Sequence, residues 1–238
     1  MITAKAEEKS LTLNIHNSIG GGWYEESNDE NNVQNVDDLA KVLNKNKDAN
    51  MIDIYINSPG GDVMEGIGIY NILKRSRAYK RVYVDGFACS IASVIAMCGN
   101  SISMPKSSMQ MIHNAWTVAM GNANDLRKAA DDLDKINETI VQAYMSKFSG
   151  SEKELRDLMD KESYLTADEC LKYGLCTKIV DDNDNTKQDT DNGLDSMTNL
   201  YANKLEQLEH IKGLIKNLDA ETAKPEPVNE PQGETGKD

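Results

Sequence analysis

The sequence predicts an α/β fold, because two kinds of segment alternate from residue 11 to residue 180. Short segments rich in β-branched and long apolar residues, bounded by Gly, Pro or Asn, are typical of strands. Between them, apolar residues recur every three or four positions, which is typical of amphipathic helices. Strands and helices that alternate along a chain usually form a sheet covered by helices. We therefore expect one α/β domain over residues 1–180.

The expected elements follow one another along this domain. Residues 11–16, 51–57, 81–85 and 109–113 are predicted to be strands. Helices are predicted where the apolar residues repeat, from Val33 to Leu43, from Val63 to Leu73, and over residues 125–148. A further helix of small apolar residues is expected to begin just after Ser90.

The chain after Val180 has a different composition. Residues 181–195 are acidic and almost free of apolar side chains, so we expect a flexible linker. Over residues 196–219 apolar side chains recur at nearly heptad spacing, which predicts an amphipathic helix, either a coiled-coil or docking helix or a solvated one. Residues 220–238 are rich in Pro, Glu and Gly and are expected to be disordered.

Charge and hydropathy exclude several classes of function. The formal net charge is -13, whereas nucleic-acid binding depends on Lys and Arg that neutralise phosphates. The longest apolar run, residues 91–97, is far shorter than the roughly 20 residues that span a bilayer. The first ten residues resemble neither a secretory signal nor a transit peptide. We therefore expect a soluble, cytoplasmic protein without a nucleic-acid or membrane partner.

The four cysteines, Cys89, Cys98, Cys170 and Cys176, form no C-x-x-C pair. Each lies in an apolar context, where a reduced thiol behaves as a small hydrophobic group. The sequence contains no H-E-x-x-H motif and no G-x-x-x-x-G-K-[ST] loop. No metal, no other cofactor and no ATP hydrolysis by this chain are predicted.

Ser90 is the first candidate for chemistry. It lies where a predicted strand ends and a helix begins, so free backbone amides and the positive end of the helix dipole could stabilise an alkoxide or an oxyanion. The other interpretation is a serine that only caps the helix. Similarly, the glycines of INSPGGDV, residues 56–63, could direct an amide toward a bound carbonyl, or could only form a tight turn.

His113 is the second candidate. Of the three histidines, it alone is expected at the apolar end of a strand, where an imidazole would enter a cleft. One histidine cannot build a metal site, which leaves the role of general base. A serine nucleophile with a histidine base is the chemistry that these residues allow. The absence of G-x-S-x-G argues against the α/β-hydrolase arrangement.

Four segments, in this order, resemble the proteolytic subunit of the Clp proteases. They are INSPGGDV at 56–63, GFACSIAS at 86–93, MQMIHN at 109–114 and ESYLTADECLKYGL at 162–175. Two further segments, GGGWYEES at 20–27 and residues 113–128, resemble the phage and prophage branch, the Clp-like head maturation proteases. The resemblance extends from about residue 11 to residue 180.

This resemblance implies a role for individual residues. Ser90 would be the nucleophile and His113 the general base, while the amides of Gly61 and Ile91 would form the oxyanion hole. The family's acid is an aspartate two residues before an aromatic residue. Glu162 holds that position here, and Asp160 is its competitor.

The resemblance also implies a fold of repeated β-β-α units, shared with crotonases, in which residues 125–148 form a long handle helix. Subunits would self-associate into stacked rings and act on protein or peptide substrates. The expected function is an ATP-independent serine endopeptidase that cleaves phage scaffold or capsid proteins in head maturation. The alternatives are a Clp-type peptidase fed by a separate ATPase, a crotonase-fold acyl-CoA enzyme, and a ring scaffold without catalytic activity.

Overall fold

The computed structural model describes residues 2–7, 9–20, 32–33 and 35–180. The chain divides into two compact units, residues 1–193 and 194–238, and every described residue belongs to the first. The predictions for residues 181–195, 196–219 and 220–238 lie outside the described residues. No helix in the described part is both long and apolar enough to cross a membrane.

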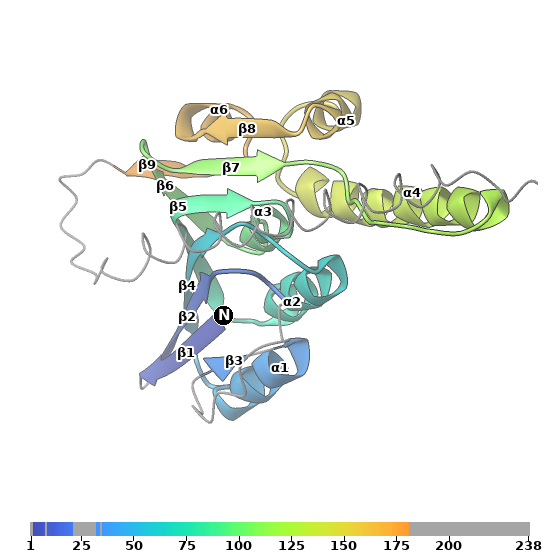
Figure 1. The fold of residues 1–238 in the computed structure, drawn as a ribbon. Helices are drawn as coiled ribbons and strands as arrows, with labels where there is room; N and C mark the ends of the chain where they lie inside the picture. Colours follow the sequence, from blue (N-terminus) through green and yellow to red (C-terminus); the bar gives the residue numbers. More distant parts are fainter. Residues whose placement is uncertain (1, 8, 21–31, 34, 181–238) are drawn as a thin grey trace, which may run out of the picture. The chain divides into compact units, whose positions relative to one another are not determined.

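A mixed sheet organises the described residues (Figure 1). Its hydrogen-bonded order is β3-β1-β2-β4-β5-β6-β9, and β7 joins β5 to β8. The strands are β1 Ile2–Glu7, β2 Ser10–His16, β3 Asn32–Val33, β4 Met51–Ser58, β5 Tyr79–Cys89, β6 Ser101–Pro105, β7 Met109–Ile112, β8 Ser163–Thr166 and β9 Lys178–Val180. Strands β2, β4, β5, β6 and β9 run parallel, as does the pair β5 and β7.

Three helices cover one face of the sheet, and a long helix projects away from it. Figure 1 shows α1, α2 and α3 stacked along the same face of the sheet, with α4 directed away from α3. The helices are α1 Val36–Lys45, α2 Val63–Arg75, α3 Ile91–Ala96, α4 Ala123–Met145, α5 Glu152–Asp160 and α6 Ala167–Lys172. The prediction of a Clp-like α/β fold is confirmed.

Several helix boundaries differ from those predicted, at α1 and α4 most of all. Val33 belongs to β3 and not to the first helix, because Asn35 caps α1 by accepting a hydrogen bond from the amide of Asp38. The long helix begins at Ala123, two residues before the predicted start, where Asn122 and Asp125 form a capping box. It ends at Met145, three residues early, and Phe148 packs in the core beyond its end.

The core lies between the sheet and its helices. The close approach of two of these helices requires a glycine. A Cβ at Gly66 would collide with the side chain of Ile91, so this glycine lets α2 approach α3 closely. All four cysteines are buried, as their apolar context predicted. Burial raises the pKa of the Cys98 thiol to about 12, which leaves it protonated near neutral pH.

The parallel strands bring three loops to one edge of the sheet. The segments that follow β4, β5 and β7 begin at the carboxyl ends of parallel neighbours, so they lie at the same edge. These segments carry the Pro-Gly-Gly loop, Ser90 and His113. The fold thus brings together residues that lie more than 20 positions apart in the sequence.

Candidate active site

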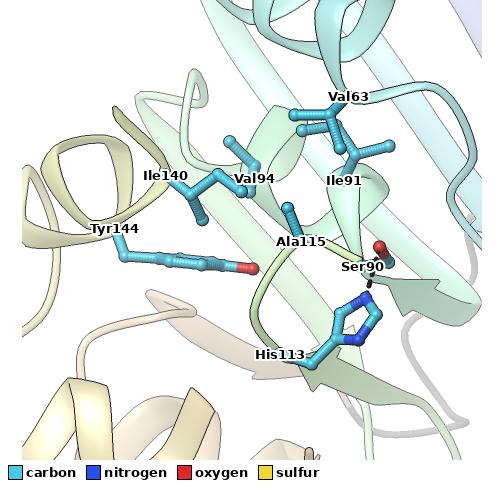
Figure 2. A pocket seen from close by; sticks show the side chains of 8 residues that line it. All are labelled: Val63, Ser90, Ile91, Val94, His113, Ala115, Ile140 and Tyr144. Carbon is cyan, nitrogen blue, oxygen red and sulfur yellow. Dashed lines mark hydrogen bonds between the residues drawn. The ribbon is translucent and has the colours of Figure 1, made fainter. Parts of the chain in front are cut away.

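Ser90 occupies the turn between β5 and α3. It has the N-cap position of α3, yet its side chain makes no capping hydrogen bond. Its Oγ instead lies 2.7 Å from Nε2 of His113 (Figure 2). The interpretation of Ser90 as a serine that only caps the helix is therefore wrong.

The backbone at Ser90 is strained. Its φ of 55° and ψ of -129° lie in a region that residues with a Cβ rarely adopt, at a typical cost of about 1–3 kcal/mol. Strained residues persist where the surrounding structure holds them, and they gather at active sites. Here the amide of Ser90 donates to the carbonyl of Met111 at 2.8 Å, and the amide of Ser93 donates to the carbonyl of Ser90 at 3.0 Å.

His113 follows the last residue of β7, as the sequence predicted for the end of a strand. Strand β7 pairs with β5 through Met111 opposite Cys89, and this register brings the residue after β7 close to the residue after β5. The imidazole presents Nε2 to Ser90 Oγ, so its Nδ1 points to the opposite side of the ring. This is the arrangement in which a histidine can take the proton of a serine.

The Pro-Gly-Gly loop packs directly against the turn that carries Ser90. A Cβ at Gly60 would lie 2.7 Å from both the carbonyl oxygen of Cys89 and the Cβ of Ser90. Gly60 also has a φ of 94°, a conformation in which a side chain is strained. Glycine is therefore required at this position for the loop to reach the turn.

Two backbone amides close to this turn have no acceptor in the described part of the chain. The neighbours of Gly61 bond to Ile19, since Ile19 N donates to Gly60 O and Asp62 N donates to Ile19 O. Gly61 lies between these two residues, and in such a parallel bridge its own N–H points away from Ile19. Ile91 is the first residue of α3, where amides have no partner within the helix.

The two candidate acids occupy different surroundings. Strands β7 and β8 are antiparallel with Ile112 opposite Ser163, so the same register continued by one residue puts Glu162 opposite His113. Glu162 has a φ of 50°, so it too lies in a region that favours glycine. Asp160 accepts a hydrogen bond from Asn114 at 2.7 Å. Among the described residues, neither carboxylate makes a hydrogen bond to His113.

A pocket opens beside Ser90 and His113 (Figure 2). The other side chains that line it are apolar or aromatic: Val63, Ile91, Val94, Ala115, Ile140 and Tyr144. From the sequence, Ile140 and Tyr144 were predicted only to lie within the long helix over residues 125–148. Their four-residue spacing does predict a shared face, but nothing in the sequence shows that this face meets Ser90. The role of Val94 and Ala115 in the lining was also missed.

The described part of the chain contains no group of three or more His, Cys, Asp or Glu side chains placed to hold a metal ion.

Comparison with known proteins gives a family match and curated relatives. Residues 22–183 match a family model described as Clp protease. The ATP-dependent Clp protease proteolytic subunit of Deinococcus radiodurans is 34% identical over 134 residues, which are 55% of this chain and 65% of the relative. The subunit of the same name from Porphyromonas gingivalis is 31% identical over 135 residues, which are 56% of this chain and 60% of the relative. The matched regions span less than two thirds of the length of these curated relatives.

Proposed function

Because the chain belongs to the Clp protease family, we propose that it is a serine-type endopeptidase with Ser90 as nucleophile and His113 as general base. The observation that carries this proposal is the 2.7 Å contact between Ser90 Oγ and His113 Nε2 in a turn that is strained at Ser90. A serine hydroxyl is a weak nucleophile until an adjacent base takes its proton.

The proposed reaction has two halves. The hydroxyl proton of Ser90 passes to Nε2 of His113 while Oγ bonds to the carbonyl carbon of the scissile peptide, whose oxygen becomes an oxyanion. The intermediate collapses, the C–N bond breaks, and the proton on Nε2 passes to the leaving amine. Water then attacks the acyl-enzyme with His113 again as base, which releases the acid and restores the Ser90 hydroxyl.

Gly61 and Ile91 are proposed to hold the oxyanion. Their amides flank Ser90 from two different elements, the Pro-Gly-Gly loop and α3, and both lack an acceptor among the described residues. Amide donors aimed at the developing negative charge stabilise the transition state more than the substrate. The loss of one such donor costs on the order of 10²-fold to 10³-fold in kcat in a well-studied serine protease.

Glu162 is proposed as the acid that orients His113. Its support is the register of β7 with β8, which puts it opposite His113, whereas Asp160 already accepts from Asn114. A carboxylate at Nδ1 holds the imidazole in the tautomer that presents Nε2 to serine, and it stabilises the imidazolium. Glutamate reaches one methylene further than the aspartate of the wider family.

The proposal is tested by labelling the intact chain with a fluorophosphonate, which bonds covalently to activated serine hydroxyls. Mass spectrometry of the digested protein should find the adduct on Ser90 and on no other serine. Labelling should proceed in the absence of ATP, because the chain contains no nucleotide-binding loop of the G-x-x-x-x-G-K-[ST] type. A scaffold without catalytic activity, or a crotonase-like acyl-CoA enzyme that does not use Ser90, would remain unlabelled.

Self-association of the chain is proposed through α4 and the segment before it. Trp116, Val118 and Met120 are exposed by 69%, 77% and 92%, and Leu126 in the first half of α4 is exposed by 45%. Apolar side chains that gather on a surface in this way are typical of protein interfaces. Subunits stacked through this segment would enclose their active sites in a chamber.

Phage scaffold or capsid proteins are proposed as the substrates. The support is the resemblance of residues 20–27 and 113–128 to the head maturation branch. We further propose that residues 1–180 form the protease domain and that the acidic segment after them binds the protein partner.

A chain that ends at Val180 tests whether residues 1–180 form the protease domain and whether the segment after them binds the partner. Every buried apolar residue of the described part lies between Ile2 and Cys176, so the shortened chain should fold and cleave small peptides with unchanged kcat/KM. Cleavage of scaffold or capsid protein should fall, because the partner-binding segment is missing. The measurement is kcat/KM for both substrates with the two chains. Failure of the shortened chain to fold would mean that the segment after Val180 belongs to the protease core.

A further inference from the structure

Behind the Ser90 turn, two buried hydroxyl groups form a chain of hydrogen bonds that the proposed mechanism does not use. The hydroxyl oxygen of Tyr144, on α4, lies 2.7 Å from Oγ of Ser93, on α3. Ser93 Oγ in turn lies 2.6 Å from the carbonyl oxygen of Ser90. Both side chains have no exposed surface. Figure 2 shows the Tyr144 ring reaching from α4 into the site, with its hydroxyl directed inward.

The direction of these hydrogen bonds follows from counting protons. Ser93 has one hydroxyl proton, and its Oγ faces the carbonyl oxygens of Ser90 and Met111, at 2.6 Å and 3.1 Å. Carbonyl oxygens only accept hydrogen bonds, so the Ser93 proton goes to one of them. The Tyr144 hydroxyl must then donate to Ser93. Because the carbonyl oxygen of Ser90 is closer to Ser93 Oγ than that of Met111, the hydrogen bonds run from Tyr144 through Ser93 to the carbonyl of Ser90.

The carbonyl of Ser90 and the amide of Ile91 are two ends of one peptide group. A donor on the carbonyl oxygen draws electron density from the amide, which strengthens the N–H as a donor. It also holds the planar group in one orientation. The chain of hydroxyls therefore acts on the amide that is proposed to bind the oxyanion.

The same hydroxyls also brace the strained turn from its other side. The carbonyl of Met111 accepts from the Ser90 amide at 2.8 Å, and Ser93 Oγ lies 3.1 Å from the same carbonyl oxygen. Met111 lies two residues before His113 on β7. Ser93 Oγ thus bonds to the carbonyl of Ser90 and lies beside the Met111 carbonyl that holds the Ser90 amide, on the strand that leads to His113. A residue with a φ of 55° needs such support to keep its conformation.

From this geometry we propose that Tyr144 and Ser93 are positioning residues, which align and polarise the Ser90–Ile91 peptide group so that the Ile91 amide binds the oxyanion. The inference rests on the proposed function. It names two residues outside the serine, the histidine and the acid, and it connects the long helix α4 to the rate of the reaction. A structural role alone would contribute to stability but would not favour the transition state over bound substrate.

Tyr144→Phe, Ser93→Ala and the double variant test the proposal in the full chain. Each single variant should lower kcat on the order of tenfold with KM unchanged, since weakening an oxyanion donor costs less than removing it. The double variant should be no slower than the slower single variant, because both act through one chain of hydrogen bonds. Tyr70→Phe, at a buried tyrosine on α2, is the matched control and should keep the wild-type kcat.

Three further readouts separate this role from a purely structural one. A peptide aldehyde, which forms a tetrahedral adduct on serine, should bind Tyr144→Phe more weakly by the same factor by which kcat/KM falls. The pH midpoint of the acidic limb of kcat/KM should not move, because His113 keeps its contact with Ser90. Activity should not recover at lower temperature, where a merely less stable variant would be fully folded.

Several outcomes would overturn the proposal: a wild-type kcat for Tyr144→Phe, a change in KM alone, a shifted pH midpoint, or full recovery on cooling. If Ser93→Ala fails to fold, Tyr144→Phe decides, because it keeps the ring and removes only the hydroxyl. A wild-type chain that neither cleaves peptides nor labels at Ser90 would instead refute the proposed function. An active wild type with an equally active Tyr144→Phe variant would refute only this inference.

Discussion

Replacing Ser90 with alanine is expected to lower kcat for peptide cleavage on the order of 10⁶-fold, as the loss of the nucleophile does in a serine protease of another fold. The reason is that Ser90 Oγ is the atom proposed to bond to the acyl group of the substrate, and it lies 2.7 Å from His113 Nε2. The hydroxyl makes no capping hydrogen bond, so its loss should leave the fold intact. Peptide hydrolysis and thermal unfolding of the purified variant measure the two expectations.

The neighbouring residues provide the controls for this experiment. Ser107→Ala, at an exposed serine on the turn after β6, should keep the wild-type rate. Cys89 and Ser93 are the other nucleophilic side chains close to Ser90 in the sequence, and both are buried. Cleavage that continues in Ser90→Ala would refute the serine mechanism, and alkylation of Cys89 would then show whether its thiol is the nucleophile.

Glu162→Gln is expected to lower kcat by about 10⁴-fold, as the corresponding amide substitution does in a well-studied serine protease. Glutamine keeps the size of the side chain but can donate as well as accept, so it no longer fixes the tautomer that presents Nε2 to Ser90. KM should change little, because substrate binding does not depend on the proton on Nδ1. The measurement is kcat and KM for a small peptide.

Asp160→Asn is the matched comparison, two residues away. Asp160 accepts from Asn114, so the substitution should weaken one exposed hydrogen bond and have a small effect on kcat. An inactive Asp160→Asn beside an active Glu162→Gln would transfer the role of the acid to Asp160. That result would leave Ser90 and His113 in their roles, since their contact involves neither carboxylate.

Strands with a regular apolar run between Gly, Pro or Asn were predicted more closely than the other elements. Strands β2, β4 and β7 were located to within one or two residues, because their short apolar runs are bounded by Gly, Pro or Asn. Strands β1, β6, β8 and β9 were not predicted. Strand β1 carries Lys5 and Glu7 among its apolar residues, and it is a strand because it pairs with β2 along its whole length. Helix α5 was also missed, since few of its residues are apolar.

The residues that could perform the chemistry were recognisable from the sequence alone. A serine after an apolar strand, a histidine after another, and glycines after a third are local features, and each depends on the residues within a few positions of it. Their order along the chain was enough to identify the family, and the family implied Glu162. Local pattern could not decide whether Ser90 caps a helix or meets His113, because the two residues are 23 positions apart.

How these residues meet depends on strand pairing that the local sequence does not reveal. Parallel pairing brings the ends of β4, β5 and β7 to one edge, and the antiparallel register of β7 with β8, continued by one residue, puts Glu162 opposite His113. The hydrogen bond between Ser93 and Tyr144 joins residues 51 positions apart, and the sequence offers no sign of it. Such contacts depend on strand register and on the approach of whole elements, which are set by packing over the entire core and not by the residues nearby.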